Sequence, residues 1–317
     1  MKKAEITTKQ IVSLIILITS FIVILYFLFF MDLGKTSDKE LCHNSVVMRA
    51  GSVLPSSSTP LDCSTHYFCI SQDGSCEKMT NPEIVKVKEE KEVYGVIANE
   101  MIDCWWMFGE GNLNYVGDDW KHNNYCSICS QIAFDDSVKK IESFSLGELD
   151  KDELYDYLSS EKIEGKDITY AEYLFGFNDL DVLKQEALEQ QGVGGTFGKA
   201  DLDKYHYVVM GIVSDIGWTN WIGSGAAGGA VVGGAIIGAI ALSNPVNWVA
   251  GALIVGGAIA GGGGVGAGGK ILSDAINPEI SAITVQGAEN KFMAPTFIEV
   301  NSDKFKALDC EKIETLS

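Results

Sequence analysis

Two long apolar segments interrupt a chain that is otherwise polar and acidic. Residues 11–31 carry no charged side chain, and at about 1.5 Å per residue they are long enough for one helix to cross a bilayer core. Residues 216–269 lack both charged side chains and histidine, and half of the chain's 34 glycines lie between residues 222 and 269. Because apolar segments of this length must be hidden from water, they dominate the prediction of the fold.

The glycine-rich segment predicts a helical hairpin over residues 216–270. Residues 243–245, with the sequence Ser-Asn-Pro, divide it into two arms, 222–242 and 246–268, because proline cannot continue the hydrogen bonds of a first helix. As a helix, each arm is roughly as long as a bilayer core is thick. The hairpin would lie between strand-forming segments, as an insertion within one domain.

Small residues recur at helical spacing along both arms and would let two helices pack closely. The glycines of this predicted zipper are Gly225, Gly229, Gly233, Gly234, Gly238, Gly257, Gly261, Gly262 and Gly266. Tryptophans stand near the ends of the arms, where an indole ring suits a membrane interface: Trp218, Trp221 and Trp248. These residues are the predicted sites of membrane contact or self-association.

The turn of the hairpin, Asn244–Trp248, has the sequence Asn-Pro-Val-Asn-Trp. With this turn and its glycine-rich arms, the segment resembles the hydrophobic hairpins of membrane-inserting toxins and of secreted or phage-tail proteins. The resemblance implies that the hairpin enters a membrane. The residues themselves leave three fates open: a hairpin permanently buried in the protein, a pair of ordinary membrane anchors, or an element that inserts conditionally.

The N-terminal apolar segment predicts a retained signal-anchor. Lys2, Lys3 and Lys9 precede it, which by the positive-inside tendency places the N-terminus in the cytoplasm. The end of the segment, Phe29–Asp32, offers no small-residue cleavage site. We therefore expect a cell-membrane protein whose residues 33–317 are extracellular.

The cysteines agree with this compartment. All eight lie beyond the anchor and outside the hairpin, which indicates disulfides in an oxidising space. They are Cys42, Cys63, Cys69, Cys76, Cys104, Cys126, Cys129 and Cys310. The sequence does not give their pairing, but a bond from Cys310 to a cysteine before residue 130 would join the end of the chain to its front.

These patterns predict an α+β fold. It would have an N-terminal transmembrane helix, a disulfide-stapled and mainly helical ectodomain with a small sheet, and the inserted apolar helical hairpin. The expected segments are a cytoplasmic tail (1–10), the anchor (11–31), a cysteine-rich loop region (33–80), an acidic helical ectodomain (81–215), the hairpin (216–270) and a C-terminal β segment (271–317) held by Cys310.

Within the ectodomain, Asn81-Pro82 is a helix-start signal. The helix that follows would have one apolar face, made of Val93, Ile97, Met101, Trp105 and Phe108. Further helical patterns cover 127–134, 146–159, 168–176 and 179–191. Short segments typical of strands cover 205–213, 280–285 and 296–300.

Two short motifs carry candidate chemistry. Cys126–Cys129 has the CxxC spacing of thiol oxidoreductases, although the polar segment before it favours structural cystines. Trp105, Trp106 and Glu110 could form a platform for a carbohydrate or a peptide, although a helix end buried in the core is the simpler interpretation.

Charge and motif content narrow the function further. The net charge of −19 argues against a nucleic-acid partner. Acidic residues such as Glu100, Asp103, Glu110 and Asp118-Asp119 would permit carboxylate pairs, but their geometry is not visible in the sequence. The chain has no phosphate-binding, dinucleotide or zinc-protease fingerprint, so we predict no cofactor and no metal.

Three segments, Cys104–Asn112, Cys126–Cys129 and Ile168–Gly176, give the chain a resemblance to single-span, cysteine-stapled archaeal surface proteins. The resemblance implies a surface location. We predict a non-enzymatic envelope protein whose hairpin engages a lipid bilayer or self-associates, giving a pore, a fusion device or a homo- or hetero-oligomeric envelope complex. The alternatives are an extracellular thiol oxidoreductase or other envelope enzyme, and a surface adhesin or binding module that uses the Trp105/Trp106 region.

Overall fold

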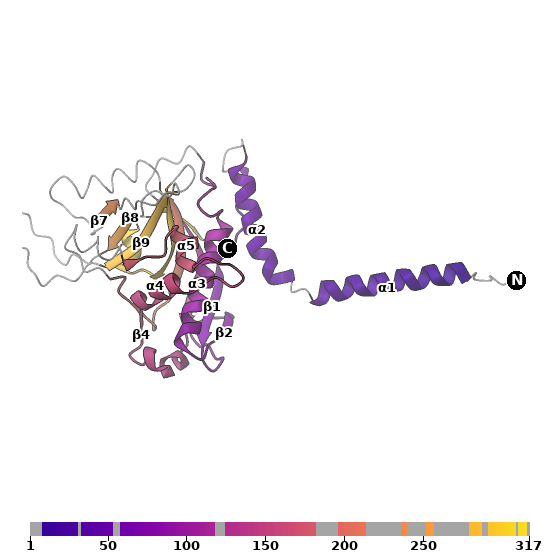
Figure 1. Ribbon diagram of the computed structural model, residues 1–317, viewed down its shortest axis with the longest axis horizontal. Coiled ribbons are helices and arrows are strands. Elements are labelled where there is room, and N and C mark those ends of the chain that lie inside the picture. Colours follow the sequence, from indigo (N-terminus) through magenta and orange to yellow (C-terminus); the bar gives the residue numbers. More distant parts are fainter. Residues whose placement is uncertain are drawn as a thin grey trace, which may run out of the picture.

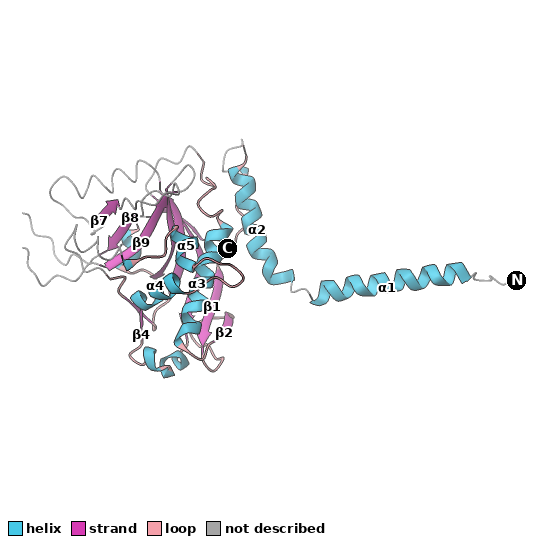
Figure 2. Ribbon diagram, in the orientation of Figure 1, coloured by secondary structure: helices cyan, strands magenta, loops and turns pink. Residues whose placement is uncertain are grey.

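The central element of the computed structural model is a mixed β-sheet (Figures 1 and 2). The structure describes residues 8–30, 33–52, 58–117, 124–181, 196–213, 236–239, 252–256, 279–286, 291–308 and 310–315. Within these ranges the sheet has nine strands in the order β2-β1-β3-β6-β10-β9-β8-β7, and β11 also pairs with β3. The strands are β1 (His66–Ser71), β2 (Glu83–Lys86), β3 (Asn124–Phe134), β6 (His206–Val213), β7 (Ile236–Ala239), β8 (Ala252–Gly256), β9 (Glu279–Gln286), β10 (Lys291–Glu299) and β11 (Cys310–Thr315).

Strand β3 lies at the centre of the pairing. It runs parallel to β1 and to β11 along one edge and antiparallel to β6 along the other. Almost every residue of β3 is buried, including the polar residues Asn124, Ser127 and Ser130, so its sequence does not alternate between apolar and polar positions. On β6, a Cβ atom at Gly211 would lie 2.6 Å from the carbonyl oxygen of Tyr125, so the close approach of the two strands requires glycine there.

Helices cover one face of this sheet (Figure 2). They are α2 (Leu33–Ala50), α3 (Glu90–Met107), α4 (Lys151–Ser160) and α5 (Tyr170–Phe175), accompanied by the short 3-10 turns η2 (Asp136–Lys140) and η3 (Glu142–Phe144). The main hydrophobic core lies between them and the sheet, where Trp105 of α3 meets Phe292 of β10 edge to face. A smaller core on the other face includes Met293, Ile298 and Leu308, beside the short helix α8 (Asp303–Ala307). A two-stranded sheet, β4 (Glu148–Asp150) with β5 (Lys199–Asp201), lies apart from the main one.

Four disulfides fasten these elements, and they use all eight cysteines. The bonds are Cys42–Cys63, Cys69–Cys76, Cys104–Cys129 and Cys126–Cys310. The last one spans a sequence separation of 184 residues and joins β11 to β3, so the end of the described chain is tied to the centre of the sheet.

Helix α1 (Thr8–Phe30) extends away from the folded body (Figure 1). No helix in the described part of the chain is both long and apolar enough to cross a membrane. The predicted anchor at 11–31 is therefore wrong, and with it the predicted cell-membrane location with an extracellular ectodomain.

The prediction of a mainly helical ectodomain with a small sheet is also wrong, because the helical part is minor beside the nine-stranded sheet. Residues 127–134, predicted as helix, belong to β3. A strand that is buried on both faces shows no alternation of apolar and polar residues, and here the neighbouring strands decide its conformation. By contrast, the strand predictions at 205–213, 280–285 and 296–300 are confirmed in type by β6, β9 and β10.

The predicted apolar helical face is confirmed on α3. Val93, Ile97, Met101, Trp105 and Phe108 are all buried. The predicted start is wrong, since the segment after Asn81 first forms β2 and the helix begins at Glu90. Residues 83–86 pair in parallel with β1, and this pairing outweighs the tendency of Asn81-Pro82 to start a helix.

Two other boundary predictions also need correction. The region 33–80 is not loop-like, because it contains α2 and β1. The pattern at 146–159 divides into β4 and α4. The helix predicted at 168–176 is confirmed as α5, where Thr169 and Glu172 form a capping box.

The helical hairpin is wrong in the parts of 216–270 that are described. These parts, β7 and β8, are strands that pair antiparallel with each other, and β8 pairs with β9. Their sequences, IIGA and ALIVG, combine β-branched residues with glycine, which disfavours a helix. The sheet edge at β9 supplies hydrogen-bond partners that a separate hairpin would have to find within itself.

Candidate functional site

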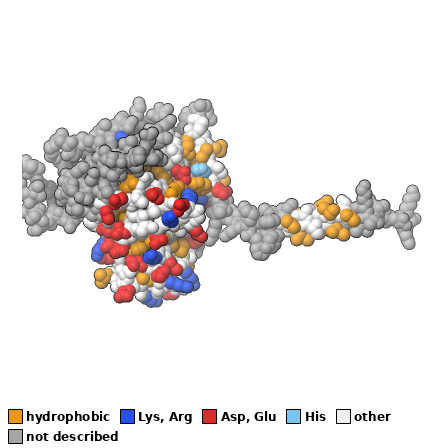
Figure 3. All heavy atoms as spheres, in the orientation of Figure 1, with side chains coloured by type: hydrophobic (Ala, Val, Ile, Leu, Met, Phe, Trp, Pro, Cys, Tyr) orange, Lys and Arg blue, Asp and Glu red, His pale blue; other side chains and the backbone are white. Residues whose placement is uncertain are grey.

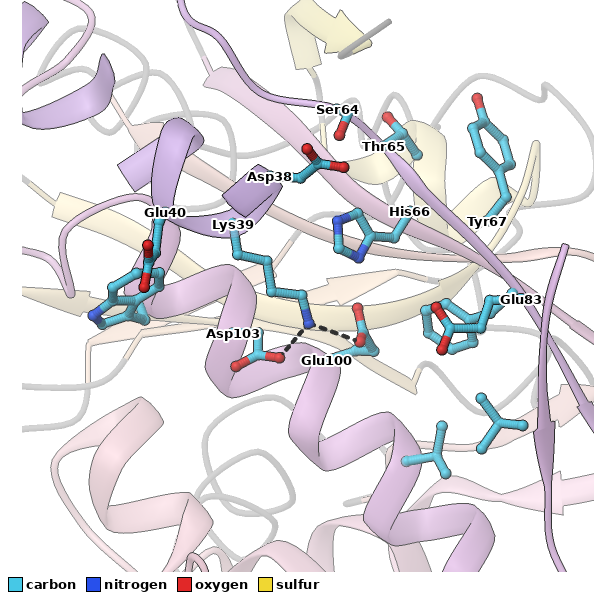
Figure 4. A pocket seen from close by; sticks show the side chains of 14 residues that line it. Asp38, Lys39, Glu40, Ser64, Thr65, His66, Tyr67, Glu83, Glu100 and Asp103 are labelled. Atoms are coloured by element: carbon cyan, nitrogen blue, oxygen red, sulfur yellow. Dashed lines mark hydrogen bonds and ion pairs between the residues drawn. The ribbon is translucent and has the colours of Figure 1, made fainter. Parts of the chain in front are cut away.

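A cleft of about 660 Å³ opens between α2, α3 and the strands β1 and β2 (Figure 4). Helix α2 forms one wall and is held to the body by the Cys42–Cys63 disulfide and by the buried Val46. Helix α3 forms the opposite wall with Val96, Glu100, Asp103 and Trp106. These four residues share one helical face, next to the face that packs on the sheet, because they follow one another at intervals of three or four.

The cleft is strongly acidic. Among its lining residues, all of them described, five carry a carboxylate and one carries an ammonium group. The carboxylates belong to Asp38, Glu40, Glu83, Glu100 and Asp103, and the ammonium group to Lys39. Acidic side chains are also prominent on the face of the body drawn in Figure 3.

Lys39 reaches from α2 across the cleft to α3 (Figure 4). Its Nζ atom lies 3.3 Å from Glu100 Oε1 and also donates a hydrogen bond to Asp103. Burial lowers the pKa of Lys39, but the charges of Glu100 and Asp103 outweigh it, so the pKa is raised above its usual value. The ammonium group is therefore held firmly in its charged form at neutral pH.

The charged form of Glu100 is disfavoured in the cleft, mainly because the side chain is buried. Burial raises the pKa of Glu100; Lys39 opposes the rise, and the charges of Asp103 and Glu83 add to it. Helix α3 adds to the negative potential, because the carbonyl end of a helix carries about half a negative charge and Asp103 stands in the last turns.

His66 projects into the same space from the start of β1 (Figure 4). Burial lowers its pKa, and the charge of Lys39 lowers it further, while Asp38 and Asp103 oppose the shift. At neutral pH the imidazole is consequently uncharged. It can offer a hydrogen-bond donor on one ring nitrogen and an acceptor on the other, without reducing the excess of negative charge.

An indole ring, that of Trp106, is part of the lining of the cleft. The ring of Trp106 stacks on His43 with 4.3 Å between centroids, and Nδ1 of His43 lies 2.8 Å from the carbonyl oxygen of Trp106. His43 therefore fixes the indole from α2. An aromatic face held in this way can accept an apolar chain or a cation.

The structure separates the three residues of the predicted tryptophan platform. Trp105 is buried in the core, Trp106 lines the cleft, and Glu110 accepts a hydrogen bond from the hydroxyl of Tyr173. Only Trp106 thus belongs to the candidate site. Of the acidic residues named as a possible carboxylate pair, the structure brings Glu100 and Asp103 together, while Asp118-Asp119 lie outside the described residues.

The CxxC segment does not form a disulfide of its own. Cys126 bonds to Cys310 and Cys129 bonds to Cys104. Both cysteines are buried in β3 and lie in the two different hydrophobic cores. One bond ties β3 to α3 and the other ties β3 to its neighbouring strand β11, which is a structural arrangement.

Most of the residues predicted for membrane contact or self-association lie outside the described residues. This applies to Trp218, Trp221, Trp248 and every zipper glycine except Gly238. Gly238 lies in β7 and pairs with Leu253 of β8.

The cleft itself was missed by the sequence analysis. Glu100, Asp103 and Trp106 recur on one face of α3, which was a detectable signal. No sequence pattern predicted that Lys39, His66 and Glu83 would lie beside these three residues. The Cys42–Cys63 disulfide, whose pairing the sequence does not give, holds α2 and therefore Lys39 at this place.

Within the described residues, no group of three or more histidine, cysteine or carboxylate side chains has a geometry that could hold a metal ion. Comparisons of the chain with protein-family models, with curated proteins and with solved structures gave no match. The function is therefore argued from the cleft alone.

Proposed function

We propose that this is a binding protein that holds an organic cation in the cleft between α2 and α3. The observation that carries the proposal is the excess of carboxylates over cations among the residues that line a cavity of about 660 Å³. The proposed function is related to the surface binding module considered from the sequence, because Trp106 belongs to both proposed binding sites.

The charge of the cleft selects the ligand class. Five carboxylates face one ammonium group and a histidine that is neutral at pH 7, so an anion would be repelled and a neutral ligand would gain nothing from the field. Partial burial strengthens the attraction, since the effective dielectric constant falls away from bulk water.

The size of the cleft favours a small organic molecule. A volume of this order is typical of cavities that take ligands of metabolite or drug size. The carboxylates come from three elements, α2, α3 and β2, and therefore surround the space instead of converging on one point. An elongated cation with a charge at each end can meet two of these groups, with its chain against Val85, Val96 and Trp106.

The test uses three probes of equal length and different charge on the purified full chain. We expect 1,5-diaminopentane to bind saturably in a calorimetric titration, and at least tenfold more tightly than 1,5-pentanediol or glutarate. Equal affinity for the diamine and the diol would remove the electrostatic basis of the proposal.

A variant pair locates the binding. Replacing Glu100→Gln and Asp103→Asn together should weaken diamine binding by about 30-fold, on the order of 2 kcal/mol. The matched control is Glu164→Gln with Asp167→Asn, which removes the same two charges at the same spacing from an exposed turn. If the variant with Glu100→Gln and Asp103→Asn binds the diamine as tightly as the wild type does, the diamine binds at another site.

The position of β7 favours a second candidate function, self-association. β7 is the last strand in the described sheet order, and such a strand can pair with the same strand of a second copy. Sedimentation equilibrium of the wild type and of Ile237→Pro tests this, because proline removes a backbone donor from the strand. We expect a dimer that the substitution dissociates; a monomeric wild type would dismiss the candidate.

A further inference from the structure

Lys39 carries the same positive charge as the ligand proposed for the cleft, and it is the one lysine or arginine among the described lining residues. We infer that Lys39 is a built-in competitor: its ammonium group occupies the cation position between Glu100 and Asp103, and a cationic ligand binds there by displacing it. This inference rests on the proposed function and adds its regulation.

The geometry supports exchange rather than a permanent ion pair. The side chain of Lys39 keeps 23 % of its surface exposed, so its head group can reach water without breaking the core. Lysine also has a long flexible stem and a compact head group that is not locked into a planar two-point contact. Asp103 is more exposed still, at 38 %.

The attachment of α2 makes this exchange local. Cys42 is fixed to Cys63, and it lies three residues beyond Lys39, less than one helical turn away. Val46 and the stack of His43 on Trp106 hold the following turns. The Lys39 side chain can therefore leave the carboxylates while the helix stays in place.

The charge balance indicates what displacement does. When a ligand ammonium replaces that of Lys39, Glu100 and Asp103 keep one cation between them, and the released Lys39 returns to solvent. The ligand thus competes with an ammonium group that is covalently tethered and always present at high local concentration. Removing this competitor should leave the carboxylates in place and increase their affinity for a cation.

The experiment compares Lys39→Met with the wild-type full chain in calorimetric titrations with 1,5-diaminopentane. Methionine keeps an unbranched stem of similar length and removes the charge. We expect the variant to bind the diamine about tenfold more tightly. The matched control is Lys91→Met, which removes a lysine from the exposed side of α3, where its side chain is 72 % exposed; its affinity should equal that of the wild type.

A second variant separates charge from packing. Lys39→Arg keeps the competitor and should bind the diamine with wild-type affinity or more weakly. If the wild type binds and Lys39→Met binds no more tightly, the competitor role is overturned while the proposed function stands. If neither the wild type nor Lys39→Met binds the diamine, the proposed function fails and this inference fails with it. Tighter binding in Lys39→Met alone, with both controls unchanged, supports both.

Discussion

Two lysines of this protein, Lys39 in the cleft and Lys151 at the start of α4, show how differently the fold treats the same side chain. Lys39 lies between two carboxylates at the edge of a cavity, and their charges raise its pKa. Lys151 is the first residue of α4 and is buried, and its pKa falls to about 7. The first site is arranged to hold a cation, and the second is not.

The causes of the low pKa of Lys151 are physical and local. Burial is the largest, the charge of Lys304 adds to it, and Asp152 and Glu299 oppose it only in part. The N-terminal end of α4 also carries a positive partial charge, which disfavours an ammonium group there. A buried lysine alone therefore does not mark a cation site; what marks the cleft is the surplus of carboxylates around a cavity.

The largest expected effect concerns Lys151. Its pKa is about 7 in the folded state and 10.5 in the unfolded state, so between these values the unfolded chain binds the extra proton. Stability should therefore rise with pH over this window, on the order of 1 kcal/mol per pH unit. Urea unfolding at pH 7, 8.5 and 10 measures the slope, and Lys151→Met should abolish it.

Lys140→Met is the matched control for that slope, because Lys140 is 67 % exposed and should leave the pH dependence unchanged. A wild-type slope of zero, or the same slope in Lys151→Met, would show that Lys151 stays charged when folded. The contrast between the two lysines would then disappear.

The next effect is the opposite response of the cleft lysine. Lys39→Met should destabilise the protein by about 1 kcal/mol at pH 7, because Glu100 is left partly buried beside Asp103 without its cation. At pH 7 the substitution Lys151→Met should stabilise the fold. Two stability changes of the same sign, measured in parallel urea titrations, would contradict the comparison.

A smaller effect links ligand affinity to pH. The pKa of Glu100 is raised above 4.5, so protonated Glu100 persists to higher pH than an ordinary glutamate. A cation favours the deprotonated form, so diamine affinity should rise with pH through the range in which Glu100 loses its proton, which lies above that of an ordinary glutamate. Glu100→Gln should flatten this part of the profile in calorimetric titrations. A steeper profile in that variant would assign the proton to another group.

The smallest expected effect is that of salt. Because the cleft opens to water, raising the salt concentration from about 0.05 M to 0.5 M should weaken diamine binding several-fold by screening. The pH-dependent stability due to Lys151 should respond much less, since a buried group is poorly screened. Equal salt sensitivity of the two quantities would indicate that both sites are exposed alike.

The sequence predicted those parts of the fold in which periodicity is local. The buried face of α3, with Val93, Ile97 and Met101, follows from helical spacing alone, and β6 and β10 follow from short β-rich runs. The strand at residues 127–134 was not predicted, because a strand that is buried on both faces shows no alternation of apolar and polar residues. The segments 236–239 and 252–256 were not predicted as strands either, because their conformation depends on the pairing of β7 with β8 and of β8 with β9.

The site was less accessible to sequence reasoning than the fold. Glu100, Asp103 and Trp106 share a helical face that the sequence does show. Lys39 and His66 reach them only through the Cys42–Cys63 bond and the parallel pairing of β1 with β2 and β3. Eight cysteines permit many pairings, so no local pattern fixes which segments meet.

The two neighbouring tryptophans offer the most direct test of the central claim, that the cleft binds an organic cation. Trp106 lines the cleft and Trp105 lies in the core against Phe292, so they form an internal pair of probe and control. Their indole N–H signals can be followed by NMR while 1,5-diaminopentane is added to the full chain. If the cleft binds the diamine, the Trp106 signal should shift saturably while the Trp105 signal changes little. An unmoved Trp106 signal at a saturating diamine concentration would contradict this claim.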